Sequence, residues 1–137
     1  MAVHKEVVAT WQHRGMVFSG AHPGKPPVII DGHATEGPSP VDTLLISLAT
    51  CTGSDVVMIL EKKRIDLREL RIGVSGTRRD EEPRRFLAIK LVYTVTAPGA
   101  SEQAVRHAID LSLEKYCSVT HSLNPDIPIT YDLALQA

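Results

Sequence analysis

The segment SPVDTLLISLATCTGSDVVMILEKKR, residues 39–64, decides how this chain folds. Ser39 fits the N-cap of a helix, Pro40 fits the first helical position, and Asp42 completes a capping box three residues after Ser39. A helix from Val41 to about Lys63 is apolar or small on every side for most of its length, so protein must surround it. A helix of this length would reach about 35 Å. We therefore expect a break or bend near 52–54 and partial cover by a second subunit.

The residues before this helix predict three short strands. Residues 3–11 alternate imperfectly between apolar and polar side chains, Gly15 turns the chain toward a second strand around 16–18, and a third strand covers 28–30. Residues 19–27 are rich in Gly and Pro and indicate a loop. The result is an antiparallel meander, which by itself would bury too little apolar surface to be stable.

The residues after the helix predict two more strands, a second helix and a final strand. The strands cover 70–76 and 87–95, with Leu87, Ile89, Leu91, Tyr93 and Val95 on one face, and the charged link between them is an exposed hairpin end. Ser101 caps a helix that carries Val105, Ile109, Leu113 and Tyr116 on one stripe and has Cys117 at its far end. Residues 127–135 alternate strictly. The order is βββ-α-ββ-α-β, which predicts a single α+β domain over 1–137.

Composition excludes several classes of function. The 137 residues suit one domain, and a 43% hydrophobic content is that of a folded globule. Fifteen Lys and Arg against sixteen Asp and Glu give a net charge of −1, which argues against nucleic-acid binding. No apolar run approaches the roughly 20 residues that span a bilayer, and the N-terminus lacks the apolar stretch of a signal peptide. These features predict a cytoplasmic protein without a membrane partner.

The two cysteines are the residues best suited to chemistry. Cys51 lies among small neighbours in the apolar helix, where it is either a small core side chain or a thiolate nucleophile in a narrow apolar pocket. Since burial raises the pKa of a thiol, a reactive Cys51 needs a nearby cation. Cys117 is its one possible intramolecular disulfide partner, although the sequence separation says nothing about their distance.

Arg14 is the cation that we nominate for activating a cysteine, because it lies at the turn between the first two strands and an arginine stays charged when partly buried. A solvated turn residue is the alternative interpretation. Asp42 could pair with Arg14, although its place in the capping box already accounts for it.

A metal site is the competing chemistry. Cys117 and His121 are four residues apart and would share a helix face, and Cys51 could join them as a third zinc ligand. No CxxC or HExxH spacing supports this idea, so we expect neither a metal nor another cofactor.

Three segments resemble the OsmC/Ohr family of osmotically inducible and organic hydroperoxide resistance proteins. Residues 39–64 resemble the family's helix with its reactive cysteine, and AVRHAIDLSLEKYCSVTHSL, residues 104–123, resembles the segment with its second cysteine. SGTRRDEEPRRFLAIKLVYTVT, residues 75–96, fits the family's hairpin. The resemblance implies an OsmC-like fold as an intertwined homodimer, with sheets from both subunits around two central helices and active sites at the interface.

The resemblance also implies a function. Cys51 would be the peroxidatic cysteine of a thiol-dependent peroxidase that reduces organic hydroperoxides, and Cys117 the resolving cysteine. An external dithiol, for example of the lipoyl type, would reopen the Cys51–Cys117 disulfide. The family's hydroperoxidases carry a Glu directly after the helix-start Pro, whereas this chain has Val41 there and Asp42 one residue later. The sequence is therefore closer to the less characterised OsmC-like branch. A non-catalytic redox-sensing or small-ligand-binding protein on the same fold is the alternative.

Overall fold

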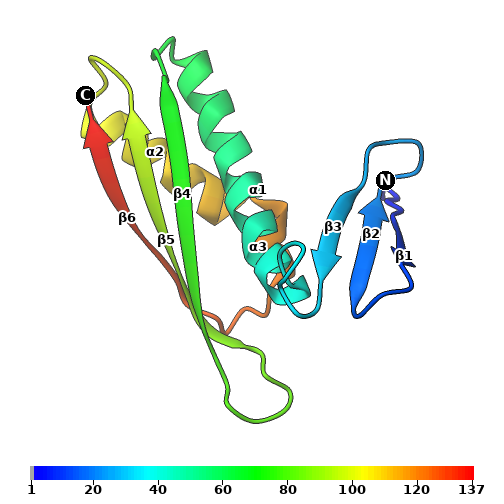
Figure 1. Ribbon diagram of the computed structural model, residues 1–137. Coiled ribbons are helices and arrows are strands. Elements are labelled where there is room, and N and C mark those ends of the chain that lie inside the picture. The colour runs from blue at the N-terminus through cyan, green and yellow to red at the C-terminus, as the bar shows by residue number, and fades with distance from the viewer. Residues whose placement is uncertain (1) are drawn as a thin grey trace. The chain divides into compact units, whose positions relative to one another are not determined.

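The computed structural model describes residues 2–137 and divides the chain into two compact units, one ending at Leu44 and the other running from Leu45 to Ala137. The elements follow the predicted order, with an additional short helix after Cys117 (Figure 1). Each unit contains one three-stranded sheet. The predicted α+β class is confirmed.

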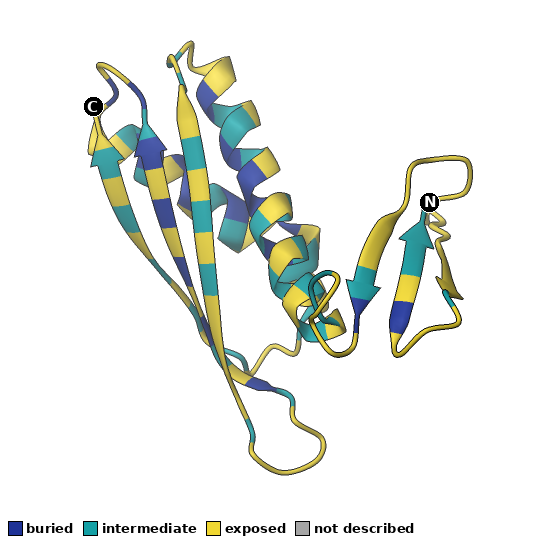
Figure 2. Cartoon of the chain, viewed as in Figure 1, coloured by how far each residue is buried: buried dark blue, intermediate teal, exposed yellow. Residues whose placement is uncertain are grey.

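The first unit holds an antiparallel sheet of β1 (Val8–Trp11), β2 (Val17–Ala21) and β3 (Val28–Asp31) in that order. The first strand is shorter than predicted, and the second continues into the segment predicted to be a loop. Most of the sheet is not buried (Figure 2). Large apolar side chains are exposed on all three strands, among them Val8 at 58%, Trp11 at 46% and Val28 at 59%. This sheet alone therefore leaves much of its apolar surface in water, as its small size led us to expect.

The long helix, α1, runs from Pro40 to Lys62, and its predicted capping box is confirmed. The Asp42 amide donates to Ser39 Oγ and the Ser39 amide donates to Asp42 Oδ2, each with a donor–acceptor distance of 3.0 Å. The predicted break near 52–54 is wrong, because α1 is helical throughout. At Gly53 the helix passes close to β4, where a Cβ atom would lie only 3.0 Å from Ile72 Cδ1. The glycine therefore allows close packing rather than a break.

The length of α1 corrects a second expectation. The sequence predicts no apolar run long enough to span a bilayer, but by length and composition alone this 23-residue helix is apolar enough to cross a membrane. The core helix of a folded domain passes the same test. Five residues of α1 are buried within the chain, which are Leu48, Thr52, Gly53, Val56 and Leu60.

The second unit has the sheet order β4 (Glu69–Arg78), β5 (Phe86–Thr96), β6 (Ile129–Gln136). β5 pairs antiparallel with β4 and parallel with β6. The helices lie against one face of this sheet (Figure 1). The central strand supplies the core through side chains that are at most 2% exposed, namely Ile89, Leu91, Tyr93 and Val95. Leu87 was predicted on this face but is 44% exposed, because a register shift at 77–78 turns Phe86 inward instead.

The second predicted helix ends earlier than expected. Ser101 caps it as predicted, since its Oγ accepts the Ala104 amide at 3.1 Å. The α-helix α2 covers Glu102–Leu111, and a π-helical turn, Ser112–Tyr116, follows before α3 (Ser118–Ser122). The π turn changes the helical phase, so Tyr116 leaves the predicted apolar stripe and is 48% exposed.

Candidate active site

The two cysteines lie close together in the second unit. Cys51 belongs to α1 and is partly exposed, whereas Cys117 precedes α3 and is buried. Both are free thiols. Burial raises the pKa of the Cys117 thiol, and the neighbouring Cys51 side chain raises it further, while Thr120 acts in the opposite direction. The two thiols are thus within interaction range, which the sequence separation left open.

Local hydrogen bonds fix the position of Cys117. Its amide donates to the Ser112 carbonyl at 2.7 Å and so closes the π turn. Its Sγ accepts the Thr120 amide at 3.4 Å and caps α3. Turns of π geometry are rare and are frequent at functional sites, because they aim one side chain away from the regular helical phase. Here the turn places the thiol at the junction of two short helical segments.

Buried hydroxyl groups connect the two cysteine-bearing segments. Thr52, which follows Cys51, lies with its Oγ1 2.8 Å from both Tyr93 Oη and Ser112 Oγ. Ser112 Oγ also lies 2.8 Å from Asp55 Oδ2. We call these four side chains the hydroxyl network. Thr52, Tyr93 and Ser112 are fully buried, and burial is the main cause that raises the pKa of Tyr93 to about 12.

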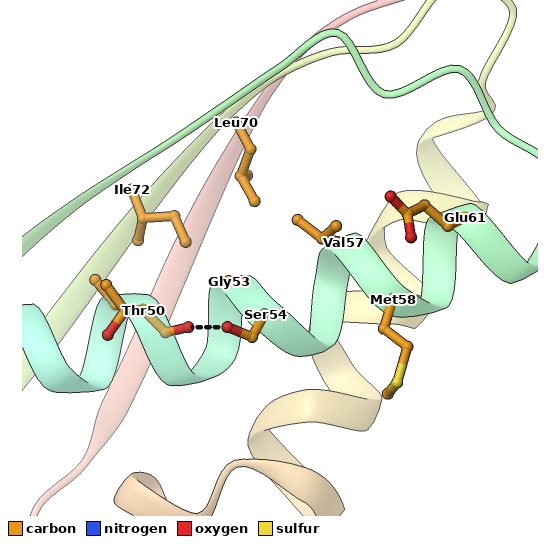
Figure 3. A pocket seen from close by; sticks show the side chains of 9 residues that line it. Thr50, Gly53, Ser54, Val57, Met58, Glu61, Leu70 and Ile72 are labelled. Carbon is orange, nitrogen blue, oxygen red and sulfur yellow. Dashed lines mark hydrogen bonds between the residues drawn. The ribbon is translucent and has the colours of Figure 1, made fainter. Parts of the chain in front are cut away.

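An apolar groove of about 590 Å³ runs between α1 and β4. Figure 3 shows Leu70 and Ile72 of β4 facing Val57 and Gly53 of α1 across it. The hydroxyls of Thr50 and Ser54 are turned to their own helix, donating to the carbonyls of Ile46 and Thr50 at 3.0 and 2.7 Å. The remaining lining residues are Ala49, Met58 and Glu61. The groove is therefore lined mainly by apolar atoms. Two of its lining residues, Ala49 and Thr50, belong to the turn of α1 that carries Cys51.

The acidic partner of Arg14 is Glu36, whereas the sequence suggested Asp42. Two guanidinium nitrogens donate to the carboxylate, Nε to Oε2 at 2.9 Å and Nη2 to Oε1 at 2.6 Å. This bond is the main cause that lowers the pKa of Glu36 and raises that of Arg14. The possible Arg14–Asp42 pair is not formed: Arg14 pairs with Glu36, and the Asp42 carboxylate accepts the Ser39 amide in the capping box.

The loop that presents Glu36 is organised by Asp31. Its carboxylate accepts the amides of His33, Thr35 and Glu36 at 2.9, 3.2 and 3.0 Å. These amide bonds lower the pKa of Asp31, led by the one from His33. Asp31 is itself 2% exposed and ends β3. The end of the strand thus sets the loop conformation, and the loop holds Glu36 against Arg14.

Comparison with known proteins identifies the family. The family model described as OsmC-like protein matches residues 32–132. Protein YhfA of Escherichia coli K12 is 36% identical over 124 residues, which are 90% of this chain and 92% of YhfA. The chain belongs to the OsmC-like family. The match to the family model contains both cysteines and the hydroxyl network, but begins after Arg14.

Solved structures agree with this assignment of the fold. An OsmC-like protein of Mycoplasma pneumoniae superposes with a TM-score of 0.84 at 19% identity, over the full length of both chains. The organic hydroperoxide resistance protein OhrB of Bacillus subtilis superposes with a TM-score of 0.62 at 17% identity, over 96% of this chain and 98% of OhrB. The OsmC-like fold is therefore shared with a hydroperoxide resistance protein.

Residues 2–137 contain no group of three or more His, Cys, Asp or Glu side chains placed so that they could hold a metal ion. The spacing of Cys117 and His121 suggested ligands on one helix face. However, Cys117 precedes α3 as its N-cap, and His121 is exposed.

Sequence reasoning missed Glu36 and the hydroxyl network. Glu36 lies in a Gly- and Pro-containing loop with no periodic pattern, so nothing local marked it. Asp55 did carry a signal, since a carboxylate in an apolar helix needs a polar partner. The sequence could therefore have marked Asp55 as a residue with a polar partner. It could not identify that partner, because only the tertiary fold brings Ser112 to Asp55.

Proposed function

We propose that this protein is a thiol-dependent peroxidase that reduces organic hydroperoxides to alcohols. The observation that supports this most strongly is the pairing of a partly exposed thiol, Cys51, with a buried neighbouring thiol, Cys117. The exposed member can meet a peroxide, and the buried member can react only with its neighbour. That division of access matches a peroxidatic and a resolving cysteine.

The proposed cycle has an oxidation by peroxide, a condensation that forms the disulfide, and a reduction by an external dithiol. The Cys51 thiolate attacks the terminal peroxide oxygen, the O–O bond breaks, and the alkoxide takes a proton and leaves as the alcohol. Cys51 is then a sulfenic acid. The Cys117 sulfur attacks the Cys51 sulfur, and the hydroxyl leaves as water when it takes a proton, so that a disulfide remains. An external dithiol then reduces this disulfide by exchange and is itself oxidised.

Arg14 is proposed to supply the positive charge that favours the Cys51 thiolate and the developing alkoxide. Glu36 takes the place that we had considered for Asp42, as the acid that orients the guanidinium through two hydrogen bonds. Glu36 is then a positioning residue, and Asp42 has a structural part only.

The apolar groove supports organic rather than inorganic peroxide as the substrate. Its lining beside the Cys51-bearing turn can hold an alkyl group, from which hydrogen peroxide gains nothing. The physiological reductant is proposed to be a dithiol of the lipoyl type. Two free cysteines also suit a cytoplasmic, reducing environment.

A homodimer is part of the proposal. Exposed apolar side chains on the first sheet and on α1, including Phe18, Ile46 and Met58, need cover that one chain does not provide. Light scattering coupled to gel filtration should give twice the 15.0 kDa chain mass at micromolar concentration. A monomer under these conditions would remove the dimer from the proposal.

Stopped-flow measurement of thiol loss tests the activity. Reduced protein should react much faster with cumene hydroperoxide than with hydrogen peroxide. Cys51→Ser should lower the rate to that of buffer, whereas Cys117→Ser should still form a Cys51 sulfenic acid, detectable with dimedone. Equal and slow reaction with both peroxides would refute the peroxidase.

The groove also supports a second function, the binding of a small apolar ligand without turnover. Such a protein would retain ligand affinity in the Cys51→Ser variant. Titration with a fluorescent fatty acid, together with the peroxide kinetics, separates the two. Binding with peroxide reaction at the buffer rate favours the ligand-binding protein.

A further inference from the structure

The hydroxyl network joins the two cysteine-bearing segments close to the cysteines themselves. On α1, Thr52 follows Cys51 directly and Asp55 lies one turn later. On the other segment, Ser112 begins the π turn, and its carbonyl accepts the Cys117 amide. One residue, Ser112, therefore holds α1 through its side chain and Cys117 through its backbone.

The hydrogen-bonding capacity of these groups makes the network directional. A hydroxyl has a single hydrogen, and Ser112 Oγ lies 2.8 Å from both Thr52 Oγ1 and Asp55 Oδ2. An ionised carboxylate can only accept. When Ser112 donates to Asp55, Thr52 must donate to Ser112, and Tyr93 must donate to Thr52. All three hydroxyls are then satisfied by one arrangement, which buried polar groups require.

We propose that Ser112 is the positioning residue of the cysteine pair: its hydroxyl, held by Thr52 and Asp55 of α1, fixes the turn that presents Cys117 to Cys51. This inference rests on the proposed Cys51–Cys117 disulfide. Neither Ser112 nor Thr52 takes part in the chemistry. They raise the effective concentration of one thiol at the other by limiting the motion of the turn.

The test measures the stability of the disulfide without peroxide. Wild-type protein and variants are equilibrated in buffers of reduced and oxidised dithiothreitol, quenched with an alkylating reagent and analysed by mass spectrometry. The dithiothreitol couple supplies and accepts the two electrons, so the outcome does not depend on peroxidase activity. A structural role alone would lower the melting temperature without shifting this equilibrium.

Ser112→Ala and Thr52→Val should each lower the equilibrium constant for disulfide formation about tenfold, which raises the reduction potential by about 30 mV. Thr52→Ser keeps the hydroxyl and should stay within about twofold of wild type. Ser122→Ala is the matched control, because this exposed serine donates to the Ser118 carbonyl of its own helix, at 2.8 Å. If Ser112→Ala does not fold, Thr52→Val and Tyr93→Phe decide the question.

Wild-type equilibrium constants in both Ser112→Ala and Thr52→Val would overturn the proposal, as would an equal decrease in Ser122→Ala. Absence of a Cys51–Cys117 disulfide in the wild type at every buffer ratio would also overturn it. If the disulfide forms in this buffer and shows the expected dependence, but peroxide does not produce it, then the peroxidase fails and the positioning role stands.

Discussion

The charged loop of the first unit and the cysteine pair of the second unit are organised by opposite means. Arg14 and Glu36 are exposed and joined by ionic hydrogen bonds, and Asp31 shapes the loop that carries Glu36. Cys117 is buried, and it is held by hydrogen bonds to backbone amide and carbonyl groups. The first arrangement is an exposed ion pair, whereas the second is a buried thiol held by backbone hydrogen bonds.

The two arrangements should therefore respond to pH in opposite directions. Amide and guanidinium partners lower the pKa values of Asp31 and Glu36, so these groups stabilise the fold in their charged forms. Burial raises the pKa values of Cys117 and Tyr93, so these groups stabilise it in their neutral forms. Acid should weaken the first arrangement and alkali the second.

The largest expected difference between the units is in packing. Leu48 is 1% exposed in the second unit, and Leu48→Ala should cost about 2–5 kcal/mol through lost burial and a cavity. Val8 is 58% exposed in the first unit, and Val8→Ala should change stability by no more than about 0.5 kcal/mol unless the partner subunit of the proposed homodimer covers this side chain. Urea unfolding followed by circular dichroism measures both. A large cost for Val8→Ala would mean that a partner subunit covers the first sheet in solution.

A smaller effect concerns the start of α1. Ser39→Ala removes the hydroxyl that accepts the Asp42 amide and should cost about 1 kcal/mol in the same urea experiment. Asp42→Asn should leave the peroxide rate close to that of the wild type, because this carboxylate belongs to the cap. A loss of rate in Asp42→Asn with unchanged stability would restore Asp42 to the active site.

Alkaline pH should lower the stability of the protein through ionisation of the buried Cys117 thiol. Because the folded pKa of Cys117 is raised, its stabilising contribution is complete below the pKa of an unfolded thiol, about 8.5, and is lost as the pH rises through the folded value. Under reducing conditions, the urea midpoint of the wild type should fall more steeply above about pH 8.5 than that of Cys117→Ser. Parallel slopes for the two proteins would contradict a raised pKa.

Acid should lower the stability of the protein through protonation of the Asp31 carboxylate. The folded pKa of Asp31 is lowered, so its contribution is complete above the unfolded pKa, about 3.9, and is lost as the pH falls through the folded value. The stability of Asp31→Asn should consequently depend less on pH than that of the wild type below about pH 4. Contributions from the other carboxylates are common to both proteins, so the difference between the two urea-midpoint curves isolates Asp31. Coincident curves would show that the loop amides do not favour the charged form.

Local sequence patterns predicted the helices and strands and singled out the two cysteines. They did not predict which residues meet in the folded chain. The Ser39–Asp42 capping box and the alternation of β5 depend on neighbours in sequence, so both could be read directly. The Arg14–Glu36 pair joins residues 22 apart, and the Ser112–Asp55 bond joins residues 57 apart. The outward turn of Leu87 likewise follows from a register shift between two strands. Such features depend on the tertiary fold, which periodicity does not specify.

One equivalent of cumene hydroperoxide added to fully reduced protein decides whether Cys51 and Cys117 act as a peroxidatic and resolving pair. Each peroxide consumed should remove two thiols and yield a Cys51–Cys117 disulfide within one chain, identified by peptide mapping. Loss of one thiol per peroxide, a disulfide between chains, or recovery of the peroxide unchanged would show that the two cysteines do not act as such a pair.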